Sequence, residues 1–253
     1  MIERRFYLET QDGSMDCFSV HPEEGGPFPT VLFYMDAPAI REELRDMARR
    51  LASAGYFVLL PNLFYRVGTE RNYPFDQAAI RNDPKQRQIM AETMADLTNA
   101  KVISDTESML AYVAREDAAT RSTAALGYCM SGQYVVSVMA AFPETFSCGA
   151  SYYGVRIITD ESDSPHLAAD RIQGKLYLAF AERDHWVPDE NLERIRELFT
   201  GEDKPHRVEL YPGTEHGFAF WKRPVYHKDA AERHWERMHQ LFRQNLAVAP
   251  GWS

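Results

Sequence analysis

The stretch Thr123-Ala-Ala-Leu-Gly-Tyr-Cys-Met-Ser-Gly132 decides the fold, because an apolar run changes here into a glycine-bounded turn and then a helix. The run 123–126 is short and apolar, as expected of a strand buried on both faces of a parallel sheet. The pattern Gly-x-Cys-x-Ser-Gly over residues 127–132 matches a nucleophile elbow, whose crowded backbone needs small neighbours. It predicts Cys129 as a nucleophile, although the pattern alone fits a buried structural cysteine equally well.

Strands and helices alternate on both sides of this stretch, which predicts one α/β domain over residues 1–253 with a doubly wound, mostly parallel sheet and helices on both faces. The Asp12-Gly13 turn predicts a hairpin near the start. Residues 62–100 are rich in Arg, Asn, Asp and Pro, and we interpret them as a lid-like excursion. The expected strands are 6–8, 15–20, 30–34, 56–60, 123–127, 148–153, 176–180 and 207–211, and the expected helices are 40–51, 76–81, 84–97, 102–113, 133–141, 190–199 and 229–245.

Composition narrows the classes of function. The 253 residues carry 28 Lys and Arg against 37 Asp and Glu, a net charge of −9, which argues against a nucleic-acid partner. Three cysteines without a CxxC pair predict neither a disulfide framework nor a metal site. The chain shows no signal-peptide pattern and no apolar run long enough to span a membrane. We therefore expect a cytoplasmic protein without membrane association, as a monomer or homodimer.

Two more residues follow later strands and complete a chemical pattern. Asp184 comes after the strand 176–180, and His216 comes after the strand 207–211. Taken alone, either residue could have a structural role: Asp184 could cap a turn, and His216 could be an ordinary surface residue. Together with Cys129 they give the order nucleophile, acid, base of an α/β-hydrolase. The order predicts that His216 takes the thiol proton and that Asp184 orients the imidazole.

Stabilisation of an oxyanion needs backbone donors near the sulfur. The N–H of Met130 is one candidate, because it follows the nucleophile at the start of a helix. The second should come from the loop after the strand 30–34, where Pro38 has no N–H and Ala37 is the natural donor. Asp36 either lies close to Cys129 or caps the helix expected to begin near residue 39, and the sequence leaves both readings open.

Four segments carry a resemblance to a known family: Gly127-Tyr-Cys-Met-Ser-Gly132, Ser151-Tyr-Tyr-Gly-Val155, Arg183-Asp-His-Trp-Val-Pro188 and Glu215-His-Gly-Phe218. With its element order, the chain resembles the dienelactone hydrolase family over most of residues 14–245. The resemblance implies the triad Cys129, Asp184 and His216, an oxyanion hole from Met130 and Ala37, and no cofactor. It also implies hydrolysis of an enol-lactone or related small ester through a thioester acyl-enzyme.

The chain departs from this family at the expected substrate site. Asp36 stands where the family has Glu, and Gly217 and Phe220 stand where a Ser and an Arg bind the substrate carboxylate. An arginine of the excursion, Arg66, Arg71 or Arg81, could bind the substrate carboxylate instead. The predicted pocket residues are Tyr65, Arg81, Tyr153, Trp186, Phe218 and Phe220.

Other readings of the same scaffold are an acyltransferase, a carbon–carbon hydrolase and a non-catalytic binding protein, since a fold does not fix a function.

Overall fold

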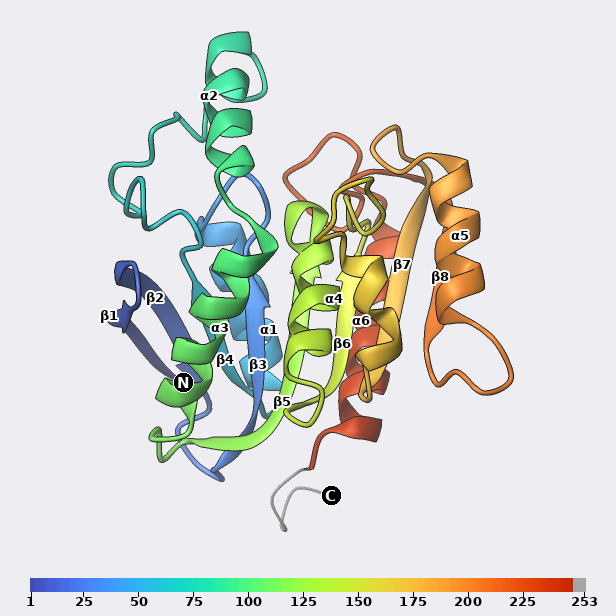
Figure 1. Ribbon diagram of the computed structural model, residues 1–253. Coiled ribbons are helices and arrows are strands. Elements are labelled where there is room, and N and C mark those ends of the chain that lie inside the picture. Colours follow the sequence, from blue (N-terminus) through green and yellow to red (C-terminus); the bar gives the residue numbers. More distant parts are fainter. Residues whose placement is uncertain (248–253) are drawn as a thin grey trace. The chain divides into compact units, whose positions relative to one another are not determined.

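The computed structural model describes residues 1–247, and the C-terminal end of the predicted domain, 248–253, lies outside them (Figure 1). Contacts group the chain into two compact units that divide after Arg121. The elements are β1 (Ile2–Thr10), β2 (Gly13–His21), β3 (Phe28–Tyr34), α1 (Glu42–Ser53), β4 (Phe57–Pro61), α2 (Pro84–Ala95), α3 (Asn99–Val113), β5 (Ala119–Tyr128), η1 (Cys129–Ser131), α4 (Gly132–Ala141), β6 (Phe146–Tyr152), η2 (Pro165–Arg171), β7 (Lys175–Arg183), α5 (Asp189–Phe199), β8 (Arg207–Glu215) and α6 (Lys228–Asn245).

The first unit contains the strands β1, β2, β4 and β3 in that spatial order. β1 and β2 form the predicted hairpin, β2 pairs with β4 antiparallel, and β3 pairs with β4 in parallel. Side chains of β1 alternate between two helices, as the strand period of two requires. Glu3 accepts a 2.7 Å hydrogen bond from Arg49 of α1. Phe6 stacks on Tyr112 of α3 with ring centroids 4.7 Å apart, so the two helices cover opposite faces.

The second unit contains β5, β6, β7 and β8, each parallel to the next. Gly149 of β6 faces α4 so closely that a Cβ there would lie 2.4 Å from the sulfur of Met139. Tyr152, on the other face of β6, donates a 3.0 Å hydrogen bond to the backbone oxygen of His234 in α6. Figure 1 shows α4 and α6 on opposite faces of these strands. The predicted α/β class, with a mostly parallel sheet and helices on both faces, is confirmed.

The excursion differs from expectation at one point. The helix predicted over 76–81 is wrong, because this segment forms turns. The Asp76 carboxylate and carbonyl accept hydrogen bonds from the N–H groups of Ala78 and Ile80, at 2.8 Å and 3.1 Å, so the segment begins like a helix but does not continue as one. Pro84 also disfavours helical backbone at the residue before it. A helix forms only from Pro84 onward, where the Asp83 carboxylate caps it through the N–H of Lys85.

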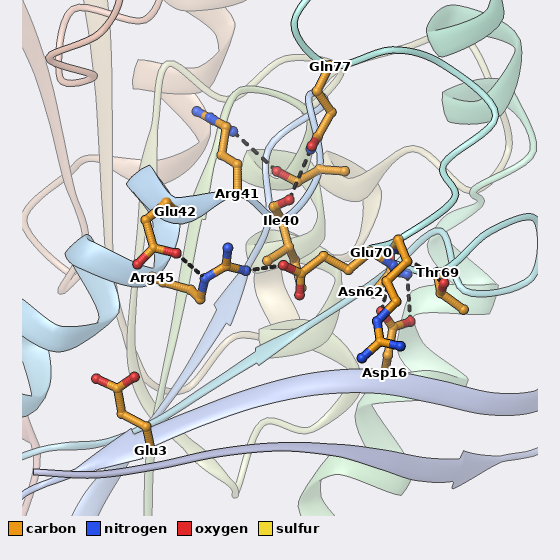
Figure 2. A network of polar contacts seen from close by, with 12 residues as sticks. Glu3, Asp16, Ile40, Arg41, Glu42, Arg45, Asn62, Thr69, Glu70 and Gln77 are labelled. Carbon is orange, nitrogen blue, oxygen red and sulfur yellow. Dashed lines mark hydrogen bonds and ion pairs between the residues drawn. The ribbon is translucent and has the colours of Figure 1, made fainter.

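Polar contacts tie the start of the excursion to the rest of the first unit (Figure 2). The Asp16 carboxylate accepts hydrogen bonds from the Asn62 side chain at 2.7 Å and from the backbone N–H of Glu70 at 2.8 Å. Arg45 of α1 pairs with the Glu70 carboxylate. Gln77 donates from Nε2 to the carbonyl oxygens of Pro38 and Ile40, so it ties the excursion to the loop after β3. Movement of the excursion as a lid stays a prediction.

Candidate active site

Cys129 sits on a sharp turn at the end of β5. Its backbone has φ of +54°, in the left-handed region that side-chain-bearing residues rarely adopt. The turn leads directly into η1 and then α4. A Cβ at Gly127 would lie 2.6 Å from the carbonyl oxygen of Ser131, so glycine is needed on the strand side of the turn. This is the crowded, strained geometry that the elbow pattern predicts.

The second crowded position of the elbow is Gly132. A Cβ there would lie 2.2 Å from the Cα of Gly154, in the loop after β6. Ser131 is tolerated because its hydroxyl bonds locally: it accepts from the N–H of Tyr128 at 2.9 Å and donates to the Tyr128 carbonyl at 3.1 Å. Ser131 is thus a small residue of the elbow whose side chain also fastens the turn.

Asp184 and His216 meet as predicted. His216 Nδ1 lies 2.7 Å from Asp184 Oδ2, and the two side chains are 10% and 2% exposed. The carboxylate can only accept, so Nδ1 carries the proton of this bond. The other carboxylate oxygen accepts a 3.0 Å bond from the N–H of Trp186, which fixes the acid at the end of β7. The imidazole is thereby oriented with Nε2 free of the carboxylate.

The imidazole also responds to the sulfur of Cys129. Burial lowers the pKa of His216, but attraction to Cys129 and hydrogen bonding to Asp184 and Cys129 outweigh it and raise the pKa to about 9. His216 Nε2 is buried and makes no hydrogen bond of regular geometry within residues 1–247. The Coulombic attraction between the imidazole and the sulfur does not need a regular hydrogen bond, because attraction depends less on angle. The three side chains are thus electrostatically coupled in the second unit.

The other two cysteines lie in different surroundings. Cys17 in β2 and Cys148 in β6 are both buried. Burial raises the pKa of both thiols, to about 12 for Cys148, which keeps them protonated. Cys129 is partly exposed. Only the elbow cysteine is therefore accessible as well as paired with an imidazole.

The aromatic residues predicted for the pocket divide into two groups. Tyr153, Phe218 and Phe220 have no solvent exposure. The ring of Tyr153 meets those of Phe218 and His216 edge-on, with centroids 5.3 Å and 5.0 Å apart. These residues pack behind and beside the imidazole, whereas Trp186 is 61% exposed. Trp186 is therefore the member of this set that is open to a ligand.

The pocket residues predicted from the excursion lie in the first unit. The Tyr65 hydroxyl donates to the Asp105 carboxylate at 2.8 Å and shares a 2.6 Å hydrogen bond with Thr10. Arg66, the alternative carboxylate-binding residue, pairs with the same Asp105. Arg81 is exposed. Tyr65 and Arg66 thus have partners within their own unit, and a substrate role for Arg81 stays a prediction.

Asp36 has a partner that the sequence did not reveal. Its buried carboxylate pairs with Arg41 at 2.5 Å, and Arg41 also pairs with Glu43 at 2.9 Å. The helix after this loop, α1, begins at Glu42 with Arg41 at the N-cap, so the capping role considered for Asp36 is wrong. Burial opposes the charge on Arg41, but the two carboxylates raise its pKa. The one sequence feature that could have indicated this ion pair is the basic residue five positions after Asp36.

Arg223 is a second residue that the pattern did not single out. Its Nη1 lies 2.8 Å from where a Cβ of Gly217 would be, and Gly217 has φ of +92°. The guanidinium also lies over the ring of Phe220, 5.0 Å from its centroid. The Arg223 guanidinium therefore fills the space that a side chain at residue 217, directly after His216, would need.

Comparison with known proteins now places the chain. Residues 15–246 match the model of the dienelactone hydrolase family. The chain belongs to the dienelactone hydrolase family. A Methylorubrum extorquens protein named "Putative carboxymethylenebutenolidase" is 29% identical over 94% of this chain and 79% of its own length. A Synechocystis protein of the same name is 27% identical over 90% and 91%. The chain is thus a dienelactone hydrolase-like hydrolase.

Solved structures agree on the fold. A Klebsiella pneumoniae structure described as a "Putative Dienelactone Hydrolase" matches with a TM-score of 0.84 at 22% identity, over 96% of this chain and 98% of that one. A dienelactone hydrolase from Anabaena variabilis matches with a TM-score of 0.64 at 14% identity, over 97% and 99%. The α/β-hydrolase fold expected of this family member is confirmed. Across residues 1–247, no helix is both long and apolar enough to cross a membrane.

Proposed function

We propose that this family member hydrolyses a small carboxylic ester or lactone, with Cys129 as nucleophile, His216 as base and Asp184 as the residue that orients His216. The observation that carries the proposal is the buried 2.7 Å contact between Asp184 and His216, on an imidazole whose pKa is raised by the neighbouring Cys129. An imidazole held in one tautomer beside a thiol is the arrangement that activates a sulfur nucleophile.

The reaction proceeds in two steps, formation of a thioester and its hydrolysis. With the thiol proton on His216, the Cys129 sulfur attacks the acyl carbon to give a tetrahedral oxyanion. The oxyanion collapses, the bond to the leaving oxygen breaks, and His216 returns the proton to that oxygen. Water, deprotonated by His216, then attacks the thioester, which releases the carboxylic acid and restores the thiol. The backbone N–H groups of Met130 and Ala37 are the proposed donors to the oxyanion.

The proposed substrate class is an enol-lactone of the dienelactone type or a similar small ester. The names of the curated relatives support the lactone, since carboxymethylenebutenolidase denotes hydrolysis of such a ring. Gly217 and Phe220 replace the family residues that bind the substrate carboxylate. We therefore expect p-nitrophenyl acetate, which has no carboxylate, to be hydrolysed at least as readily as cis-dienelactone.

The test compares two cysteine variants on both substrates. Cys129→Ala should abolish hydrolysis, because it removes the nucleophile. Cys148→Ala is the matched control: it removes a buried thiol of β6 and should retain most activity. Turnover by Cys129→Ala at the rate of the control variant would show that another residue carries the reaction.

The thioester can be detected directly. Under acidic quench, mass spectrometry of the wild type with p-nitrophenyl acetate should show one added acetyl group on the peptide containing Cys129. Cys129→Ser should react more slowly, since His216 would have to deprotonate a far less acidic hydroxyl. A label on another peptide, or equal rates for the serine variant, would contradict the proposal.

A further inference from the structure

Three arginines converge on one buried carboxylate in the second unit. Glu209 of β8 is 8% exposed and accepts a 3.1 Å hydrogen bond from the Tyr177 hydroxyl of β7. Arg207 pairs with it at 2.7 Å from the same strand. Arg233 and Arg237, one turn apart on α6, also pair with it, Arg237 at 3.2 Å. One buried acid needs one basic partner, so three create a surplus of positive charge.

The surplus is +2, from three guanidinium groups and one carboxylate, within a chain whose net charge is −9. Tyr177 does not offset it, because burial raises the pKa of its hydroxyl and keeps it neutral. A carboxylate offers about four acceptor positions and a guanidinium five N–H donors. Glu209 can therefore satisfy only a minority of the donors that surround it.

The remaining donors are accessible and held in place. The side chains of Arg207, Arg233 and Arg237 are 49%, 43% and 29% exposed. Arg207 lies over the ring of Tyr177 at 6.0 Å, and Arg233 lies over the ring of Tyr211 at 5.3 Å. Stacking on aromatic rings restricts the guanidinium groups and so lowers the entropy cost of binding a ligand.

We propose that this arginine cluster, Arg207, Arg233 and Arg237 around Glu209, binds a phosphoryl group. A charge of +2 matches a phosphate dianion, and forked guanidinium donors from two elements suit its several oxygens better than the two oxygens of a carboxylate. Glu209 precedes His216 by seven residues, about 20 Å along an extended chain, so the cluster is separate from the proposed catalytic residues. The site is additional to the proposed hydrolysis and does not depend on it.

Calorimetric titration with inorganic phosphate tests the proposal on the whole protein, against chloride at the same ionic strength. Arg233→Gln/Arg237→Gln should weaken phosphate binding about tenfold or more, because each charge-assisted hydrogen bond contributes strongly. The matched control is Lys228→Gln/Arg243→Gln, which removes two exposed charges from the same helix and should leave the affinity within about twofold. Equal losses in both double variants, or no phosphate binding beyond chloride by the wild type, would overturn the proposal.

The Glu209→Gln variant tests whether the three arginines bind an anion or only neutralise the buried Glu209 carboxylate. It retains the shape of the side chain and raises the charge of the cluster from +2 to +3. The phosphate dianion should then bind about fifteenfold more tightly, the effect of removing one negative charge about 5 Å from its two charges in water. Unchanged or weaker binding by a folded Glu209→Gln variant would refute the site. A parallel titration with glycerol 3-phosphate identifies the source: equal affinity indicates free phosphate, and tighter binding indicates a phosphate monoester.

Discussion

The interactions of His216 with Asp184 and Cys129 predict how the stability of the fold depends on pH. The pKa of His216 is raised from 6.5 to about 9 in the folded state. The folded protein therefore holds this proton more tightly than the unfolded chain does. The resulting stabilisation is complete below pH 6.5 and disappears as the pH rises through 9.

The size of the effect follows from the shift. A rise from 6.5 to about 9 is about 2.5 units, and each unit corresponds to 1.36 kcal/mol. The wild type should lose about 3 kcal/mol of unfolding free energy between pH 6 and pH 9.5 through this group. His216→Gln cannot titrate and should lack this decline. Because His216 is only 10% exposed, solvent weakens the effect little.

Urea unfolding at several pH values between 6 and 9.5 measures the difference. His185→Gln is the control, since His185 is an exposed histidine close to Asp184 in the chain. It should follow the wild-type curve. Cys129→Ala should show an intermediate decline, because the sulfur contributes to the raised pKa. If wild type and His216→Gln lose stability in parallel over this range, the coupling argued from the structure is incorrect.

Three further predictions concern single contacts. Asp184→Asn should keep the fold but lower kcat about 10³-fold or more in ester assays, because an amide can hold the wrong imidazole tautomer. Gly132→Ala should lower the thermal midpoint severely or prevent folding, since its Cβ would lie 2.2 Å from Gly154, whereas Gly201→Ala, with only one atom near 3.9 Å, should be tolerated. Gln77→Ala should cost about 1 kcal/mol in urea unfolding through its lost hydrogen bonds to the loop after β3; no measurable change would show that the contact contributes nothing.

Most of the fold could be predicted from hydrophobic patterns, because strands buried on both faces must be short and apolar. The strand expected at 176–180 and the helix at 190–199 lie within the observed β7 and α5. The excursion was harder to predict. Its residues are held by side-chain contacts distant in sequence, such as Asn62 with Asp16, and hydrophobic periodicity carries no information about them.

Site residues that directly follow a strand could be predicted from the sequence. The ion pairs that loop residues form could not. Asp184 and His216 come together because parallel strands deliver their carboxyl ends to one edge. The pairing of Asp36 with Arg41 could not be foreseen, since a loop residue can turn toward many partners. The aromatic residues Phe218 and Phe220 looked like pocket residues by type, but they are buried in packing around Tyr153.

The approach of Gly132 to Gly154 has a consequence for how this protein can evolve. A Cβ at Gly132 would lie 2.2 Å from the Cα of Gly154, and a Cβ at Gly154 would lie 2.3 Å from Ser151 Oγ and 2.9 Å from the Cα of Gly132. A smaller residue at Ser151 would remove only the side-chain contact and leave the contact between the two backbones, so both glycines resist gradual change while the turn at Cys129 is retained. Libraries that seek new substrates should leave this pair invariant and place their diversity at Trp186, which faces solvent.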